Sequence, residues 1–199
     1  MTAFDRLLER FDAASAGFGQ RLALVGADQW RSATPCTDWD VRALVNHVAR
    51  GNLNFAALAA GGAAADFARL REVDALGADP VAAYTTSVRA CADAFAAPNA
   101  LTRPVDYPLG RIGGAQALAV RTTDTVIHTW DLARAIGADE HLDDDLVVWV
   151  CDNLGEIYAG LPEMPTSEQT SHRFFAAAGN TPDGATRQEA LLLLMGRRP

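Results

Sequence analysis

The stretch from Ala115 to Gly137 reads AQALAVRTTDTVIHTWDLARAIG and predicts a long helix that runs to about Ile136. Glycine directly after the last turn is a typical helix end, because it adopts the left-handed backbone conformation without steric cost. Small and apolar side chains lie nearly all round this helix, with a polar notch at Asp124 and His128. Such a pattern is typical of a helix that is buried on most of its faces.

The segments on either side of this helix show helical patterns as well. Helices are predicted over residues 4–24, 37–60, 80–97, 115–136, 143–161 and 188–195, with a short extended piece at 103–107. The connection between the third and fourth of these helices is long and rich in proline and glycine. Four helices with one long crossover predict an all-α fold of the four-helix-bundle type, with extra C-terminal helices.

Local capping signals are expected to set the starts of two of these helices. Thr37 is predicted to begin the second helix, with Asp40 at its third position as in a capping box. Asp79 followed by Pro80 is predicted to begin the third helix, since proline is well tolerated in a first turn.

The chain 1–199 is predicted to be a single domain. Its hydrophobic content of 49% is sufficient for one well-filled core. The bundle is expected at about 3–137. The remaining residues, about 138–199, carry too little apolar surface for an independent core, so we expect them to pack on the bundle as a helical extension.

Composition excludes several classes of protein. The net charge is -8 and no run of basic residues stands out, which argues against binding to the phosphate backbone of nucleic acid. No apolar stretch reaches the ~18 residues that a membrane span needs. The first residues lack a signal-peptide pattern, so a cytoplasmic protein is expected. All 17 basic residues are arginine, which excludes Schiff-base chemistry and a P-loop lysine.

The three cysteines, Cys36, Cys91 and Cys151, are widely spaced and form no CxxC pair. A disulfide framework or a cysteine-rich zinc site is therefore poorly supported. Cys91 and Cys151 are expected to be small core residues. Cys36 precedes a helix start, and since nothing in the sequence pairs it with a base, a structural role is predicted.

Asp124 and His128 are four residues apart, so on a helix their side chains point the same way. With His47 from the second helix they would offer two nitrogens and one oxygen, a set suited to a divalent metal with an open position. The simpler interpretation is a polar helix face with one buried, hydrogen-bonded histidine. The apolar surroundings of the notch favour a buried charge that needs a partner, and a metal is one solution. His141, in an acidic loop, and His172, without a ligand-like neighbour, are left out of the site.

Two segments resemble a known family. Residues 34–48, TPCTDWDVRALVNHV, and residues 124–134, DTVIHTWDLAR, resemble the bacterial DinB-like metal-binding families, in particular the short actinobacterial group related to the mycothiol-dependent maleylpyruvate isomerase N-terminal domain. The resemblance implies a four-helix bundle that binds a divalent metal, usually zinc, through a histidine and an acid-xxx-histidine pair. The matching positions are His47, Asp124 and His128, with aspartate where the isomerase has glutamate. No counterpart of the isomerase's separate C-terminal domain is expected.

The resemblance implies a metal-dependent thiol S-transferase or isomerase whose substrates are a mycothiol-like thiol and an electrophile. Zn²⁺ is the expected metal, with Ni²⁺, Co²⁺ or Mn²⁺ as alternatives, and it would lower the pKa of the bound thiol. Asp131 is expected to orient a ligand or a water molecule from outside the coordination sphere, and Trp130 either lies beside the ligands or packs in the core. One alternative is a non-catalytic metal-binding helical module in stress response or partner binding. Another is a bundle with a vestigial site that acts as a homodimer.

Overall fold

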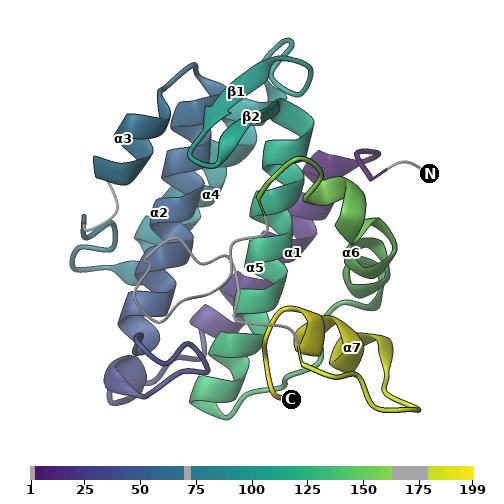
Figure 1. Cartoon of the computed structure of the whole chain (residues 1–199). Coiled ribbons are helices and arrows are strands. Elements are labelled where there is room, and N and C mark those ends of the chain that lie inside the picture. Colours follow the sequence, from purple (N-terminus) through teal and green to yellow (C-terminus); the bar gives the residue numbers. More distant parts are fainter. Residues whose placement is uncertain (1–2, 70–72, 163–178) are drawn as a thin grey trace.

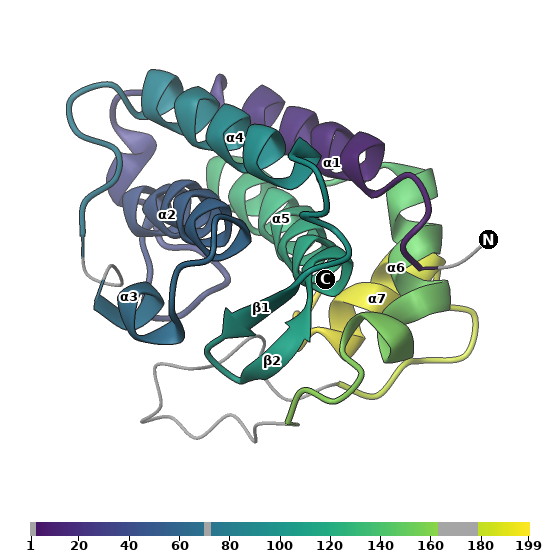
Figure 2. The ribbon, with the colours of Figure 1, turned by 90° about the horizontal axis from the view of Figure 1, so that it is seen from above.

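Four long helices form the centre of the molecule (Figure 1). The computed structural model describes residues 3–69, 73–162 and 179–199. Its elements are α1 (Leu7–Leu22), η1 (Gln29–Arg31), α2 (Val41–Ala59), α3 (Ala64–Arg69), α4 (Pro80–Ala96), β1 (Pro104–Tyr107), β2 (Gly110–Gly113), α5 (Gly114–Ile136), α6 (Asp144–Ile157) and α7 (Arg187–Leu194). Helices α1, α2, α4 and α5 form the bundle, and α5 packs against α1, α2 and α6 (Figure 2). The expected all-α bundle with a long crossover after its third long helix is confirmed.

Helix α5 is buried on all sides, as its composition predicts. Every residue from Ala117 to Ala133 is buried. One apolar cluster joins α5 to α1, α6 and α7, and a second cluster joins it to α2 and α4. The helix ends at Gly137, which has a φ of 70° and so takes the left-handed conformation expected at this position. Most polar side chains in the middle of α5 are therefore shielded from water.

Helix α2 begins three residues later than the capping-box prediction places it. The N-cap is Asp40, whose carboxylate accepts a hydrogen bond from the Ala43 N–H at 2.8 Å. Thr37 lies in a turn closed by the Trp39 N–H, which donates to the Cys36 carbonyl at 2.8 Å. The prediction that Thr37 caps this helix is wrong, because the chain turns and becomes extended again before the helix starts.

The connections contain more structure than the sequence predicts. The short helix α3 lies between the second and third predicted helices, where the sequence predicts no helix. Strand β1 pairs antiparallel with β2, although the sequence predicts only the first of these two strands. The inward side chains of β1, Val105 and Tyr107, are buried against the bundle. The predicted start of α4 is confirmed, since the Ala82 N–H donates to Asp79 Oδ1 at 3.0 Å.

Helices α6 and α7 pack beside α5 and α1 (Figure 2). Trp149 of α6 donates its indole N–H to the Ala3 carbonyl at 2.9 Å, and Leu191 and Leu192 of α7 are fully buried. Among the described helices, none combines the length and apolarity that crossing a membrane requires. His172 lies outside the described residues.

Candidate metal centre

His47, Asp124 and His128 lie together between α2 and α5. His47 is in the second turn of α2, and the other two are one turn apart in the buried middle of α5. His47 Nε2 is 3.5 Å from Asp124 Oδ2, and His128 Nε2 is 3.4 Å from Asp124 Oδ1. The two imidazole rings meet edge to face with their centroids 4.9 Å apart. The fold thus brings together the three residues that the sequence proposes as ligands.

The group is open to solvent mainly on the α2 side. The exposed fraction of the side chain falls from 28% for His47 to 13% for Asp124 and 3% for His128. Although the His47 ring is partly exposed, its Nε2 atom is buried. Of the three side chains, His47 is therefore the most exposed and His128 the least.

The donor atoms lie close enough together to hold one divalent ion. One donor atom from each of His47, Asp124 and His128 lies within 4.8 Å of the others. Ligand atoms around a tetrahedral ion with bonds of ~2.1 Å lie about 3.4 Å apart. The two histidine–aspartate separations, 3.5 Å to Oδ2 and 3.4 Å to Oδ1, are of this size but involve different oxygens of Asp124. Within the described ranges, the buried His47 Nε2 makes no hydrogen bond. Because buried polar atoms normally have a partner, a cation shared by the three residues fits this site.

A buried arginine contacts Asp124 from the same helix. Arg121 is 2% exposed, its Nη2 lies 2.7 Å from Asp124 Oδ2, and it also donates to Thr125 Oγ1 at 2.9 Å. The guanidinium fits because residue 51 of α2 is glycine. A Cβ atom on Gly51 would overlap Arg121 Nη1. Arg121 could not be predicted from the sequence, since its packing depends on a residue in a different helix.

Trp39 forms an aromatic wall beside the histidines. Its ring centroid is 4.5 Å from that of His47 and 5.8 Å from that of His128. The residue directly precedes the N-cap of α2, so the turn that delays this helix also places the indole over the candidate ligands. Trp39 lies within residues 34–48, which resemble the family, but the sequence alone predicts no role for it.

Asp131 holds the far side of the His128 ring. His128 Nδ1 lies 2.8 Å from Asp131 Oδ2, and the Asp131 side chain is fully buried. The carboxylate is in turn bound by Arg197, whose Nε donates to Oδ1 at 2.9 Å and whose Nη2 donates to Oδ2 at 2.6 Å. Asp131 therefore contacts a candidate ligand at Nδ1, while Asp124 lies near Nε2 of the same ring.

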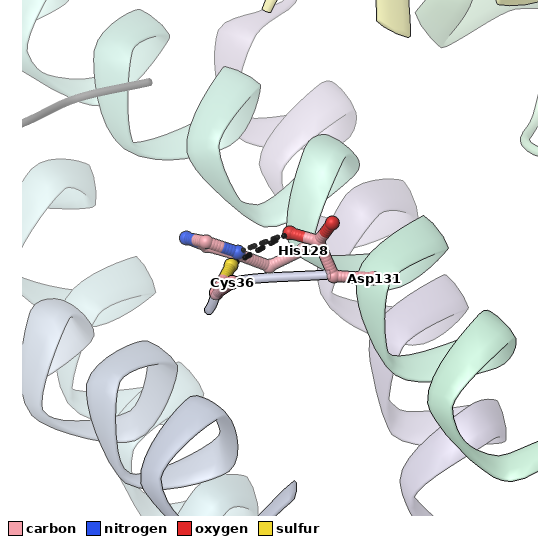
Figure 3. A group of neighbouring side chains, drawn as sticks. All are labelled: Cys36, His128 and Asp131. Carbon is pink, nitrogen blue, oxygen red and sulfur yellow. Dashed lines mark hydrogen bonds and ion pairs between the residues drawn. The ribbon is translucent and has the colours of Figure 1, made fainter. Parts of the chain in front are cut away.

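Cys36 joins the same group from the loop before α2 (Figure 3). Its Sγ is 3.4 Å from Asp131 Oδ2 and 3.4 Å from Arg197 Nη2. Cys36, His128 and Asp131 are a second set of potential metal ligands. The Arg197 guanidinium, however, already supplies the positive charge next to the carboxylate and the thiol. The sequence pairs Cys36 with no base, whereas in the structure Asp131 of α5 and Arg197, which follows α7, both lie 3.4 Å from its Sγ.

The charges of the centre follow from burial and from its ion pairs. Burial raises the pKa of Asp124, but the positive charges of Arg121 and His128 outweigh this and hold it well below its usual range. Burial lowers the pKa of His128, yet Asp124 and then Asp131 raise it well above 6.5. Burial lowers the pKa of His47 to about 4, because Asp124 compensates only in part. At neutral pH the metal-free centre thus contains one carboxylate and one imidazolium from this trio, with His47 neutral.

Two other residues considered in the sequence lie away from this group. Trp130 is 1% exposed and belongs to the apolar core, where the Arg134 guanidinium lies 4.9 Å from its ring centroid. Of the two positions expected for Trp130, beside the ligands or in the core, the structure shows the second. His141 is exposed, with its Nε2 3.7 Å from Asp144, as expected for a residue of a solvated loop.

The chain is similar in sequence and in fold to known proteins. Residues 11–133 match the family model described as the mycothiol maleylpyruvate isomerase N-terminal domain. Two uncharacterised proteins of Mycobacterium tuberculosis, from strains CDC 1551 and H37Rv, are each 35% identical over 135 residues, which is 68% of this chain and 70% of theirs. The crystal structure of the mycothiol-dependent maleylpyruvate isomerase aligns with a TM-score of 0.57 at 14% identity, covering 75% of this chain and 70% of that one. This likeness confirms the DinB-like fold, and the family match includes His47, Asp124 and His128 but not Arg197.

Proposed function

The chain belongs to the mycothiol maleylpyruvate isomerase N-terminal domain family, and from this premise we propose that it is a metal-dependent enzyme acting on a low-molecular-weight thiol. The proposed reaction joins the thiol to an electrophile, or isomerises the electrophile through the thiol. The solved isomerase is described as mycothiol-dependent, which supports a thiol of the mycothiol type as co-substrate.

One observation carries this proposal. His47 comes from α2, and Asp124 and His128 come from α5. His47 Nε2 lies 3.5 Å from Asp124 Oδ2 and His128 Nε2 lies 3.4 Å from Asp124 Oδ1, and one donor atom of each residue lies within 4.8 Å of the others, which supports binding of one shared ion. Three protein ligands leave a fourth position for a substrate, which is the arrangement of catalytic rather than structural zinc sites. Zn²⁺ is the proposed ion, and Ni²⁺, Co²⁺ and Mn²⁺ also accept such ligands.

The residues around the three candidate ligands would each have a different role. His47, Asp124 and His128 would hold a divalent ion, which would lower the pKa of a thiol bound beside it and so would supply a thiolate at neutral pH. Arg121 keeps Asp124 ionised by pairing with Oδ2, which leaves Oδ1 facing His128. Asp131 accepts the Nδ1 proton of His128, so the Nε2 lone pair of that ring is directed at the centre. Trp39 shields both imidazole rings from water on one side.

Metal analysis of the purified protein tests the proposal. We expect about one divalent ion per chain, since two histidines and one carboxylate suffice for an open site. Removal of the ion by a chelator should lower the melting temperature but leave the helical circular dichroism largely intact, because the bundle has its own core. With free zinc a hundredfold above its dissociation constant, the stabilisation should be about 2.7 kcal/mol.

The same preparations should then be assayed for reaction of a small thiol with a chromogenic electrophile, with and without zinc. Protein that binds no ion after incubation with zinc, nickel, cobalt or manganese would contradict the proposal. Loss of helical signal on chelation would mark the ion as structural instead.

Zinc binding is expected to release about one proton per ion at pH 7, because metal ligands must be deprotonated. The pKa of His128 lies well above 6.5 in the metal-free protein, so its imidazole carries a proton that zinc must displace. The pKa of His47 is about 4, so that imidazole is already neutral and releases none. The apparent affinity for zinc should therefore rise with pH until His128 is deprotonated. Calorimetric titrations in buffers of different ionisation enthalpy give the proton count, and a count near zero or near two would contradict this assignment.

A second candidate function is a metal-binding helical module without catalysis. Arg121 favours this function, because its permanently charged guanidinium lies 2.7 Å from Asp124 Oδ2 and already balances the negative charge of that carboxylate. The two functions differ in the thiol assay: a non-catalytic module would bind zinc at the same three residues and leave the rate of thiol addition unchanged.

A further inference from the structure

The residues that follow α7 are turned back toward α5 by a defined helix end. Gly196 has a φ of 70°, and its N–H donates to the Leu193 carbonyl at 3.0 Å. The Arg197 N–H donates to the Leu192 carbonyl at 2.7 Å. These two hydrogen bonds and the left-handed glycine form a Schellman motif. Because Leu192 is fully buried, the motif fixes the start of the Arg197 side chain relative to the core.

Arg197 then extends into the interior and ends on Asp131. Its side chain is 7% exposed, and it binds both oxygens of a carboxylate that is fully buried. A third nitrogen, Nη1, donates to the Met195 carbonyl at 3.0 Å, which holds the plane of the guanidinium. Paired contacts of this kind set the orientation of both groups, as a single point charge would not.

The orientation of Asp131 matters because of its neighbour. Asp131 Oδ2 lies 2.8 Å from His128 Nδ1 and is the same oxygen that accepts from Arg197 Nη2. A carboxylate that accepts the Nδ1 proton of an imidazole fixes the tautomer and the ring orientation needed for a metal at Nε2. The chain Arg197–Asp131–His128 therefore leads from the residues after α7 to the candidate ligand facing Asp124.

We propose that Arg197 is a positioning residue for the metal centre, acting through Asp131 to hold the His128 ring with its Nε2 atom toward His47 and Asp124. This inference rests on the proposed function, because it assigns His128 as a ligand. It also gives the C-terminal extension a part in the site, although Arg197 lies outside the residues that match the family model.

Fold stability alone does not account for this arrangement. A buried ion pair gains little over apolar residues of the same size, because both charges must leave water. The adjoining Leu191, Leu192 and Met195 already anchor α7 to the core without any charge. What an apolar side chain at 197 could not supply is the directed contact with both oxygens of Asp131.

The experiment compares Arg197→Met with a matched control, Arg198→Met, which changes the exposed next residue in the same way. Zinc affinity is measured by competition with a chromophoric chelator. Arg197→Met is expected to weaken zinc binding about 10–100-fold, the usual effect of losing a partner of a metal ligand. Arg197→Lys, which retains the charge but not the paired geometry, should lose part of this affinity. Arg198→Met should bind as the unmodified protein does.

A double-mutant cycle with Asp131→Asn tests the route of the effect. If Arg197 acts through Asp131, Arg197→Met should cause no further loss of zinc affinity in the Asp131→Asn background. Additive losses would overturn the proposal. So would unchanged zinc affinity in a folded Arg197→Met variant. If Arg197→Met fails to fold, zinc affinity is compared in two other variants. These are Arg197→Lys and the double variant Arg197→Met/Asp131→Asn, in which neither residue of the ion pair is left buried with an unpaired charge.

A readout that needs no metal separates this inference from the proposed function. In metal-free protein, the Nδ1 proton of His128 should give a hydrogen-bonded proton resonance that is protected from exchange with water. Arg197→Met should broaden or remove that resonance, and Arg198→Met should not. Unmodified protein that binds no zinc but shows this difference would overturn the proposed function, while Arg197 would still be the residue that orients the His128 ring. Zinc binding together with an unchanged resonance in Arg197→Met would overturn the positioning role alone.

Discussion

Replacement of Asp124 by asparagine is expected to abolish tight zinc binding and to destabilise the metal-free protein by about 3–5 kcal/mol, as the loss of one partner of a buried ion pair typically does. Arg121 is 2% exposed and would be left with a buried charge facing a neutral amide. Asparagine has nearly the size of aspartate, so the change isolates the charge from any cavity effect. Denaturant unfolding of chelator-treated protein measures the stability, and chelator competition measures the affinity.

Two further variants make this result decisive. Asp12→Asn removes an exposed carboxylate of α1 and should alter neither quantity. Asp124→Asn combined with Arg121→Met should recover much of the lost stability, since no unpaired charge remains, but should not recover zinc binding. If Asp124→Asn alone were as stable as the unmodified protein, the prediction would be wrong, because the buried charge of Arg121 would then not need Asp124 as its partner.

Removal of either histidine is expected to weaken zinc binding by a factor of about 10²–10³. Zinc sites with four protein ligands bind with about 10–16 kcal/mol, so each ligand contributes roughly 3–4 kcal/mol. The two variants should differ in stability. His47→Ala removes a ring that is 28% exposed, whereas His128→Ala empties a buried site and leaves Asp131 without one of its partners.

His128→Ala should therefore lower the melting temperature of the metal-free protein more than His47→Ala does. His141→Ala, which removes an exposed histidine from the acidic loop, is the control for both. Calorimetric melting of the three variants after chelation, followed by zinc competition, gives both quantities. Full zinc binding by both His47→Ala and His128→Ala would refute the ligand assignment.

Features that depend on neighbours in sequence could be predicted. Helix α5 was placed to within a residue, because its end is set by Gly137 and its burial by its own composition. The spacing of Asp124 and His128 fixed their common direction on that helix. The start of α2 was not placed, because the hydrogen bond from Trp39 N–H to the Cys36 carbonyl closes a turn that competes with a cap at Thr37.

Features that depend on distant parts of the chain could not be predicted. Cys36 lies 95 positions from Asp131, and Arg197 lies 66 positions from it, so no local pattern connects them. The final residues carry no motif of their own, and their contribution emerges only once α7 is packed. Arg121 was overlooked for a similar reason, since its burial requires the absence of a side chain at Gly51.

The close approach of Arg121 to Gly51 restricts the order in which a lineage can acquire the two residues. Arginine arriving at 121 opposite any larger residue at 51 would meet a Cβ atom fixed to the backbone of α2. Glycine arriving first leaves only unfilled space and a mild loss of helix propensity, of about 1 kcal/mol. The glycine is therefore the permissive step. Once the arginine is in place, a larger residue at 51 would require the guanidinium to shift from its position beside Asp124.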